Sequence, residues 1–373
     1  MNRLEVVEKL GIPADRLERM KGQILKMSNW PEPQLFRFDK AVSGVEAGTV
    51  IFDNNEIVHG YPKIRRAMML EPAIKKHFSK ELIAEEKMNG HNVRVVEVDG
   101  QMVALTRGGF ICPYSTEVAS RQIPQEVFED HPDLVLCGEM VGPNNPYVPK
   151  KIYPVEFMDF YLFDISSKGS RDLGGSQRTH RLAREYGIRD VPLLGRFEVS
   201  EASEKVRDII KQLGHEGREG VVLKDPENKV NPMKYTCSES NCVDLEFAFR
   251  YYNDYGQDFF FSRVVREGFQ AAEWGDSENE FRERCLRLGQ SLLGPMRETV
   301  EAKMNNVPIV QKVQIKVEDL QTARDFEEHL RRMGMRATFD WPEPCEDGYL
   351  VGITRVAMST NDKTRSVIEG HLW

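Results

Sequence analysis

The chain of 373 residues carries a formal net charge of −8, and 40% of its residues are hydrophobic, a composition typical of globular proteins. Its length exceeds one usual core and predicts two to four domains. The net charge excludes a wholly basic nucleic-acid coat, so any nucleic acid would bind local basic patches. No apolar run approaches the ~20 residues that span a bilayer, and the N-terminus does not begin a signal peptide, so we expect a cytoplasmic protein without membrane contact.

Several common classes of functional site are missing from the sequence. The 6 cysteines are scattered, and only Cys237 and Cys242 lie close together, without the second pair of a zinc site. Reduced thiols are therefore expected rather than a structural zinc or a disulfide framework. The sequence also lacks a P-loop, a zinc-protease helix, a dinucleotide fingerprint, and the serine-hydrolase and kinase signatures.

The N-terminal region predicts helices followed by a hairpin. Apolar residues at helical spacing indicate one or two amphipathic helices over 3–27. Residues 49–52 and 57–59 flank a polar segment, which is typical of a β-hairpin. A small basic cluster follows, formed by Lys63, Arg65 and Arg66. Without further context, such a cluster is more often a solvated loop than a binding site.

Residues 81–165 predict mostly strands. Strands are expected over 81–88, 92–98 and 101–106, and the pairs Asn89-Gly90 and Asp99-Gly100 between them favour an antiparallel meander. Two buried strands that carry acidic residues follow, then two helices, the second stopped by Gly214, and two more strands. Their expected ranges are 134–141 and 157–165, then 178–186 and 200–213, then 219–224 and 233–236.

The composition changes after about residue 243. Residues 244–272 are rich in aromatic side chains, some at helical spacing, and such a stripe more often belongs to a core or a subunit interface than to a ligand site. Residues 278–304 show a helical pattern that is broken or restarted at Pro295. The tail predicts a small separate α+β module of strand, helix, two strands and helix, over 313–317, 320–333, 336–339, 350–353 and 362–372.

Lys87 ends the first strand of the expected meander, two residues before Asn89-Gly90. If the protein performs covalent chemistry, this lysine is the predicted nucleophile. The simpler interpretation is a hairpin turn without chemistry, because an Asn-Gly pair tolerates positive φ. The local sequence favours the turn, and both interpretations can hold together.

Charged residues also stand at the ends of several later strands. They are Lys87, Arg107, Glu139, Asp164, Glu219, Lys224 and Lys234. Any one of them alone is more often part of a structural ion pair. A glutamate in a buried strand nevertheless needs a partner, because an unpaired buried charge is costly. Two or three acids near several lysines and one arginine suit a nucleoside triphosphate with Mg²⁺.

The order of these residues resembles one superfamily. Lys87-Met88-Asn89-Gly90 is similar to the Lys-x-x-Gly nucleotidyl-lysine motif of ligases and mRNA-capping enzymes. Further motifs follow in that superfamily's order: Thr106-Arg107-Gly108-Gly109, Gly138-Glu139, Phe160 to Ile165, Glu219 to Lys224, and Met233-Lys234-Tyr235. Asn92 and the flanking regions resemble the archaeal ATP-dependent RNA ligases of the homodimeric, RNA-circularising type. One departure is Pro232, which replaces the first of the two lysines usual in the last motif.

The resemblance implies an α+β fold, with a nucleotidyltransferase domain of antiparallel sheets flanked by helices. The implied division is an N-terminal α/β module at 1–60, the catalytic domain at 61–242, a helical dimerisation region at 243–308 and a C-terminal α+β domain at 309–373. The implied cofactors are ATP and Mg²⁺, with Mn²⁺ as an alternative. The implied partners are single-stranded 5′-phosphorylated RNA and a second copy of the chain.

The resemblance also implies a mechanism. Lys87 would attack the α-phosphate of ATP, and AMP would pass through lysyl-AMP to an RNA 5′-phosphate before the 3′-hydroxyl seals the strand. The lysine must be neutral to attack, so its pKa must fall from ~10.4, and Lys224, Lys234 and Mg²⁺ are expected to supply the positive charge. Phe163 would stack on adenine, and Glu219, with Asp164, would hold metal. The other implied nucleotide contacts are Glu85, Asn92, Arg107, Glu139, Lys224 and Lys234.

Charge alone indicates where RNA would bind. The predicted contacts are Lys63, Arg65 and Arg66, then Lys75 and Lys76, then Lys150 and Lys151. Two other functions stay open. One is another covalent nucleotidyltransferase, such as a DNA ligase or a GTP-using capping-type enzyme. The other is a catalytically inactive RNA-binding dimer.

Overall fold

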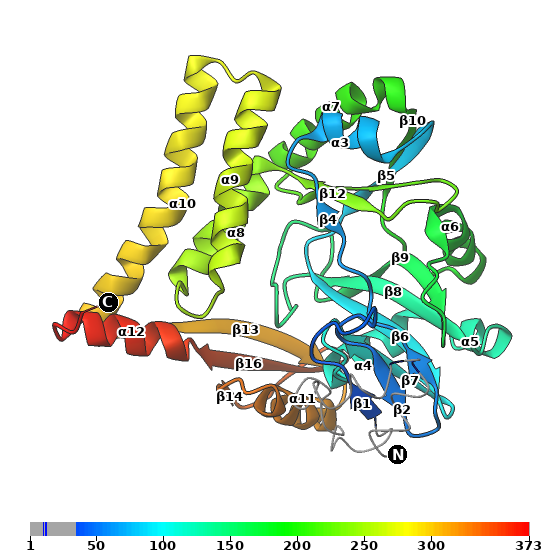
Figure 1. Ribbon diagram of the computed structural model, residues 1–373. Coiled ribbons are helices and arrows are strands. Elements are labelled where there is room, and N and C mark those ends of the chain that lie inside the picture. The colour runs from blue at the N-terminus through cyan, green and yellow to red at the C-terminus, as the bar shows by residue number, and fades with distance from the viewer. Residues whose placement is uncertain (1–9, 11, 13–34, 373) are drawn as a thin grey trace.

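The computed structural model describes residues 10, 12 and 35–372. Four sheets and the helices around them form the mixed α+β fold that the sequence predicts, and two of the sheets lie at the centre of the main body (Figure 1). The helices predicted over 3–27 lie outside the described residues, apart from positions 10 and 12. Within the described part of the chain, no helix is both long enough and apolar enough to cross a membrane.

The first central sheet has five strands in the order β10-β5-β11-β12-β4. The strands are β4 (Arg65–Arg66), β5 (Glu81–Lys87), β10 (Leu193–Glu198), β11 (Gly220–Lys224) and β12 (Met233–Thr236). One face is apolar and is covered by the helices α3 (Leu70–His77) and α7 (Val199–His215). Ala84 and Leu223 belong to this apolar face, so Glu85, Lys87 and Lys224 point the other way, because side chains alternate along a strand.

The second central sheet has four strands in the order β7-β6-β8-β9. The strands are β6 (His91–Val98), β7 (Gln101–Thr106), β8 (Leu134–Val141) and β9 (Asp159–Ser167). The helices that surround this sheet are α4 (Pro113–Gln122), α5 (Glu126–Asp130) and α6 (Gly175–Tyr186). β8 and β9 confirm the two buried strands predicted over 134–141 and 157–165.

The predicted three-stranded meander is wrong at its first turn. β5 belongs to the first sheet and β6 to the second, so the chain crosses between sheets at Asn89-Gly90. Neither of these residues has positive φ. Gly90 has a different role, because a Cβ there would lie 2.0 Å from the Met140 carbonyl oxygen. At Asp99-Gly100 both residues do have positive φ, 50° and 77°, and this pair joins β6 to β7 in a hairpin.

Two helix predictions also need correction. Gly214 does not stop α7, which continues to His215, and the left-handed residue after it is Gly217, with φ 71°. α10 (Glu278–Met304) is not broken at Pro295 but runs through it as one helix of 27 residues. A capping box at Ser277 fixes its first turn, and packing along α8 (Ser238–Arg250) supports its length.

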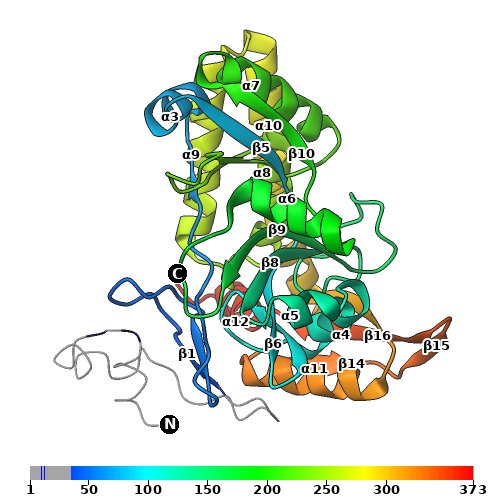
Figure 2. The same ribbon diagram turned by 90° about the vertical axis from the view of Figure 1, so that its right-hand side faces the viewer.

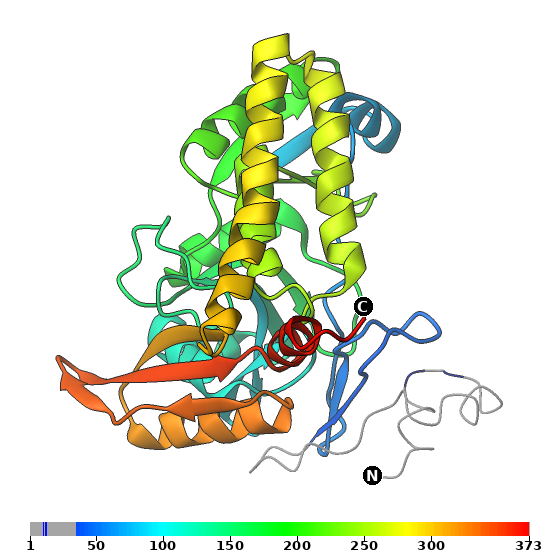
Figure 3. The same cartoon turned by 90° about the vertical axis from the view of Figure 1, so that its left-hand side faces the viewer.

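α9 (Gln257–Trp274) and α10 form a pair of long helices beside the main body (Figures 1 and 3). The side facing the viewer in Figure 3 is not covered by any other drawn element. Several large apolar side chains on the two helices are exposed: Phe261, Phe269, Phe281, Leu286 and Leu293.

The tail follows the predicted order of strand, helix, strands and helix. Its elements are β13 (Val310–Val317), α11 (Leu320–Arg332), β14 (Ala337–Phe339), β15 (Glu343–Cys345), β16 (Gly348–Val356) and α12 (Met358–Ile368). Val317 and Phe326 share one apolar core with Tyr114 of α4, so this module packs directly on the second sheet's helical layer (Figure 2). Near the other end of the chain, the predicted hairpin is confirmed by β2 (Val50–Phe52) and β3 (Ile57–Val58), which pair beside β1 (Leu35–Arg37).

Candidate active site

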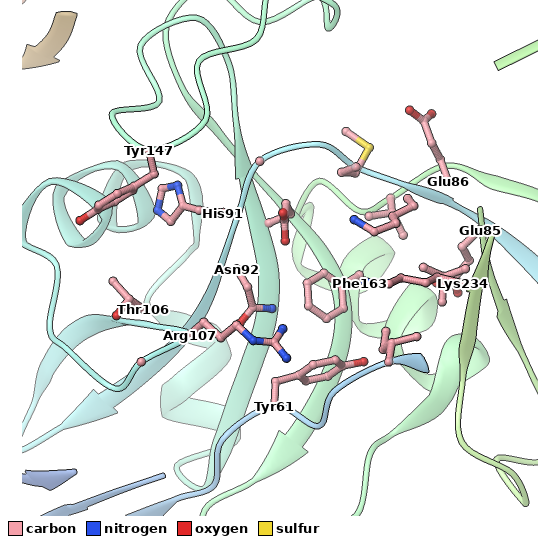
Figure 4. Close-up of a pocket in the computed structure, with 18 of the residues that line it drawn as sticks. Tyr61, Glu85, Glu86, His91, Asn92, Thr106, Arg107, Tyr147, Phe163 and Lys234 are labelled. Atoms are coloured by element: carbon pink, nitrogen blue, oxygen red, sulfur yellow. The ribbon is translucent and has the colours of Figure 1, made fainter. Parts of the chain in front are cut away.

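A cavity of about 490 Å³ opens between the two central sheets. The structure brings all eight predicted catalytic and nucleotide-contacting residues to its lining: Glu85, Lys87, Asn92, Arg107, Glu139, Phe163, Lys224 and Lys234. Strands of the first sheet supply the four that lie on β5, β11 and β12, and the second sheet and its turns supply the rest. Figure 4 shows Asn92, Arg107 and Phe163 around the same opening.

Lys87 lies at the end of β5 beside two carboxylates. Its Nζ donates a hydrogen bond to Glu219 Oε2 at 2.7 Å. Burial alone would lower the pKa of Lys87, but Glu219 and Glu139 outweigh it and raise the pKa above its ordinary value. The protein's own residues thus raise the pKa of Lys87, and the expected lowering stays a prediction that depends on Mg²⁺. The same crowding acts on Glu139, since burial and Glu219 raise its pKa to about 7 although Lys87 opposes the change.

Asn92 stands directly opposite Glu139 in the β6–β8 ladder, so the two side chains share a face. The Asn92 Oδ1 atom is buried and has no hydrogen-bond partner among the residues that the structure describes. Buried polar atoms are normally paired, and an unpaired one inside a cavity indicates a group that binds there. The pair Asn92 and Glu139 thus offers oxygen atoms to a ligand next to Lys87.

Phe163 owes its direction to an irregularity in β9. Cys137 pairs with Asp164 and Gly138 with Leu162, so Phe163 is the extra residue of a β-bulge. Its ring meets the Tyr61 ring edge-on, with centroids 5.0 Å apart and planes at 77°. Phe163 also lines the cavity, where an aromatic ring can serve as a stacking platform (Figure 4).

Lys224 occupies a different environment from Lys87, although both side chains project from the same face of the sheet. Its Nζ lies 2.7 Å from Glu85 Oε2 and 3.7 Å from Asp164 Oδ2, and all three residues are almost fully buried. Burial opposes the charge of Lys224, but the two carboxylates raise its pKa. Lys224 is thus neutralised by its own partners and is not the cation that the sequence argument assigned to activating Lys87.

The two predicted metal ligands, Glu219 and Asp164, are the predicted residues that the structure does not bring to the cavity lining. Asp164 is held by internal partners instead. It accepts hydrogen bonds from the Ile165 and Gly175 backbone N–H groups and from the Tyr61 hydroxyl, besides its contact with Lys224. Its oxygens are therefore directed to internal partners behind Phe163. Glu219, the other predicted metal ligand, is held at Lys87 instead.

The cavity has a cationic end. Lys234 and Arg107 line it, and neither forms an ion pair with a carboxylate of the described residues. Burial and the positive charges of Lys87, Arg66 and Arg107 lower the pKa of Lys234 to about 8. Such a concentration of unpaired positive charge is typical of a phosphate site.

Comparisons with known proteins agree with this geometry. The RNA ligase family matches residues 80–236, and the family described as Ligase Pab1020 C-terminal region matches residues 247–371. An uncharacterised protein of Methanocaldococcus jannaschii is 38% identical, over 99% of this chain and 96% of its own length. Two solved structures described as archaeal ATP-dependent RNA ligase, form 1 and form 2, are 40% identical over 99% of this chain and 98% of theirs, with TM-scores of 0.91 and 0.92. The chain belongs to this family of archaeal RNA ligases.

A structure from Aquifex aeolicus supports the fold alone. It is 24% identical over 97% of this chain and 100% of its own, with a TM-score of 0.89. The two 40% identical structures confirm the resemblance to archaeal ATP-dependent RNA ligases over 99% of the chain, beyond the segment that carries the motifs.

Some lining residues of the RNA ligase were not foreseen from the sequence. Tyr61 comes from the segment before the first motif, and Met333 comes from the C-terminal module. Tyr147 also lines the cavity and shares a hydrogen bond of 2.9 Å with His329 of α11. None carries a local signal, because each reaches the cavity only through long-range packing.

The predicted RNA contacts are spread over different environments. Lys63, Arg65 and Lys151 are exposed, and Lys75 and Lys76 lie on the outer face of α3. Lys150 is half-buried. Arg66 is also half-buried and donates a hydrogen bond to Asn241 Oδ1 of α8 at 3.3 Å. Arg66 is thus separated from the exposed cluster in which the sequence placed it.

Proposed function

We propose that this enzyme joins the 5′-phosphate and 3′-hydroxyl ends of single-stranded RNA, using ATP through a lysyl-AMP intermediate. One observation carries the proposal: Lys87, the aromatic side chain of Phe163 and the unpaired cations Lys234 and Arg107 line the same cavity. Adenine suits the aromatic ring, and phosphates suit the cations. This combination supports an ATP molecule bound with its α-phosphate near the lysine.

In the first step Nζ of Lys87 bonds to the α-phosphorus, and the bond from that phosphorus to the pyrophosphate oxygen breaks. Because Glu219 and Glu139 raise the pKa of Lys87, the lysine starts charged and must lose two protons in this step. The first, which frees the nitrogen lone pair, can pass along the hydrogen bond to Glu219, 2.7 Å away. The second leaves the nitrogen as the phosphoramidate forms, and the departing pyrophosphate can accept it. Phosphoryl transfer otherwise depends mainly on positioning and charge neutralisation.

In the second step an oxygen of the RNA 5′-phosphate attacks the same phosphorus, and the bond to Lys87 breaks. The lysine regains a proton, and the RNA carries AMP through a new phosphoanhydride. In the third step the RNA 3′-hydroxyl attacks the 5′-phosphorus, its proton is lost, and AMP leaves. Circularisation is the intramolecular version of this last step.

The residues around Lys87 fit a magnesium ion that is shared with phosphate. No group of three or more His, Cys, Asp or Glu side chains in the described part of the chain could hold a metal. Mg²⁺, however, commonly uses one or two protein oxygens besides waters and substrate phosphates. Glu219, Glu139 and the unpaired Asn92 Oδ1 are the donors that would hold it. When bound, the metal supplies neutralisation of phosphate charge. Mn²⁺ prefers similar oxygen ligands.

RNA and a second copy of the chain complete the proposal. The exposed Lys63, Arg65 and Lys151 are the proposed RNA contacts, and the salt dependence of RNA affinity would fall if any of them is replaced. The exposed apolar side chains of α9 and α10 are proposed to meet their equivalents in a homodimer. Light scattering should then give twice the chain mass of 42.9 kDa.

Mass spectrometry of the purified protein tests the chemistry most directly. We expect an added AMP after incubation with ATP and Mg²⁺, no adduct in Lys87→Ala, and transfer of the label to 5′-phosphorylated RNA. A label taken only from GTP would favour a capping-type enzyme. Sealing of nicked DNA but not of RNA would favour a DNA ligase. RNA that is bound but never adenylated or joined would favour the inactive RNA-binding dimer.

A further inference from the structure

Arg66 belongs to a line of side chains that crosses the first central sheet. Glu85 pairs with Val222, Val222 with Lys234, and Lys234 with Arg66. Directly paired residues of neighbouring strands share one face of a sheet. Arg66 is therefore the last member of the line and shares a face with Lys234, which lines the cavity, although Arg66 itself is not a lining residue. Its strand lies ~14 Å from that of Lys87, at ~4.8 Å per strand.

Arg66 is a half-buried cation without a carboxylate partner. Its one hydrogen bond goes to the neutral Asn241 Oδ1 at 3.3 Å, and no ion pair joins it to the acids of the described residues. Burial and the nearby Arg263 and Arg266 lower its pKa to about 10, which still leaves it charged at neutral pH. A guanidinium in this state gains from any anion that reaches it.

Lys234 has no second cation beside it on its own strand. Pro232, which stands directly before β12 and two residues before Lys234, carries no charge. The parallel pairing of β4 with β12 places Arg66 beside Lys234 on the same face. Arg66, on the neighbouring strand, thus supplies a second positive charge beside Lys234.

We propose that Arg66, together with Lys234, binds the phosphate that faces Lys87 across the α-phosphorus. This inference deepens the proposed function and rests on it. In-line substitution places the leaving group opposite the nucleophile. In the first step the group opposite Lys87 is the β-phosphate of ATP. In the second step Lys87 is the leaving group, so the group opposite it is the RNA 5′-phosphate. One oxyanion subsite therefore serves both steps.

The two sources of phosphate can be separated by measuring the steps one at a time. Arg66→Gln is the main variant, since its amide can keep the hydrogen bond to Asn241 while it removes the charge. Arg66→Lys restores a charge without the bidentate fork. Lys205→Ala, which removes an exposed cation from α7 on the opposite side of the sheet, is the matched control. Thermal melting of each variant verifies that it is folded.

We expect Arg66→Gln to slow AMP uptake from ATP, and AMP transfer from the adenylated enzyme to 5′-phosphorylated RNA, each by at least about tenfold. AMP has no β-phosphate, so its affinity should stay unchanged, and Arg66→Lys should recover part of both rates. A loss confined to the first step would assign the subsite to ATP alone, and one confined to the second would assign it to RNA alone. Rates equal to those of Lys205→Ala in both steps would overturn the inference. If the unaltered enzyme takes up no AMP, the proposed function fails instead.

Discussion

Two lysines project from the same face of the same sheet, and their surroundings differ in one respect. Around Lys224 every charged atom has a close partner: Glu85 and Asp164 contact the lysine, and His180 lies 3.1 Å from Glu85. Around Lys87 the partners are incomplete. Glu219, Glu139 and Asn92 surround the single cation Lys87. Among the described residues, Asn92 Oδ1 has no hydrogen-bond partner, and Lys234 and Arg107 line the cavity without an ion pair.

This difference distinguishes charged residues that stabilise the fold from charged residues that are available to a ligand. We call Lys224 with Glu85, Asp164 and His180 the Lys224 end of the site, and Lys87 with Glu219, Glu139 and Asn92 the Lys87 end. At the Lys224 end, complete pairing offsets the cost of burial and holds Phe163 and Tyr61 in place. At the Lys87 end pairing is incomplete, and burial raises the pKa of Glu139 to about 7, whereas burial with neighbouring cations lowers that of Lys234 to about 8. Such shifts concentrate where a protein binds or transforms a ligand. Substitutions at the Lys87 end should therefore impair activity, and substitutions at the Lys224 end should impair stability.

Replacing Lys87 should give the largest effect. Lys87→Ala removes the nucleophile, and AMP uptake should fall by more than about 10³-fold. Stability should change by only about 1 kcal/mol, because the ion pair with Glu219 is partly exposed. Lys87→Arg is the matched control, since it keeps a charge that cannot act as a nucleophile. Adduct formation in either variant would remove Lys87 from the mechanism.

Replacing Lys224 should affect folding first. Lys224→Ala leaves Glu85 and Asp164 buried without their cation, which costs about 3–5 kcal/mol. Urea unfolding measures the loss, and Lys229→Ala, an exposed cation in the loop after β11, is the control. The double variant with Glu85→Gln should recover part of the stability. An unchanged unfolding midpoint in Lys224→Ala would break the contrast between the two ends.

The sequence contained most of this site and much of the fold, for a physical reason. The motif residues stand at strand ends, and strands are predicted from local alternation of apolar and polar residues. The order of the motif residues can therefore be recognised in the sequence. Which strands share a sheet is decided by distant contacts. Asn89-Gly90 and Asp99-Gly100 are equivalent locally, yet only the second is a hairpin, because β5 finds its partners in β10 and β11. The Asn-Gly pair after Lys87 is therefore a crossing between sheets.

The roles of individual charged residues were harder to predict from the sequence. Lys224 and Lys234 are alike in sequence, and only the three-dimensional positions of Glu85 and Asp164 show that one is neutralised and the other is not. Arg66 looked like part of a surface cluster until β4 paired with β12. Tyr61 had no signal at all, since its contact with Asp164 spans more than a hundred residues.

Tyr61 offers a milder change at the Lys224 end. Tyr61→Phe keeps the ring against Phe163 but removes the hydrogen bond of 3.2 Å to Asp164. A bond to a buried carboxylate is worth about 1–2 kcal/mol, so stability should fall by that amount. The KM for ATP should rise a few-fold while kcat changes little, because the platform loosens but the lysine is untouched. Tyr252→Phe, on the distant α8–α9 connection, is a control for loss of a tyrosine hydroxyl. A change in kcat without a rise in the KM for ATP would contradict the positioning role of Tyr61.

The smallest effect concerns pH. His180 contacts Glu85 and Asp190, and the hydrogen bond to Glu85, against the opposing effect of burial, raises the pKa of His180 above its ordinary value. The folded protein therefore binds a proton more tightly than the unfolded chain. The stability that this tighter proton binding adds is fully present below the unfolded pKa of ~6.5 and is lost as pH rises through the folded pKa of His180. Stability measured by thermal melting should decline over that window, and His180→Gln should flatten the decline, whereas His215→Gln, exposed at the end of α7, should not. Equal slopes in all three proteins would show that the Lys224 end draws no stability from the charge of His180.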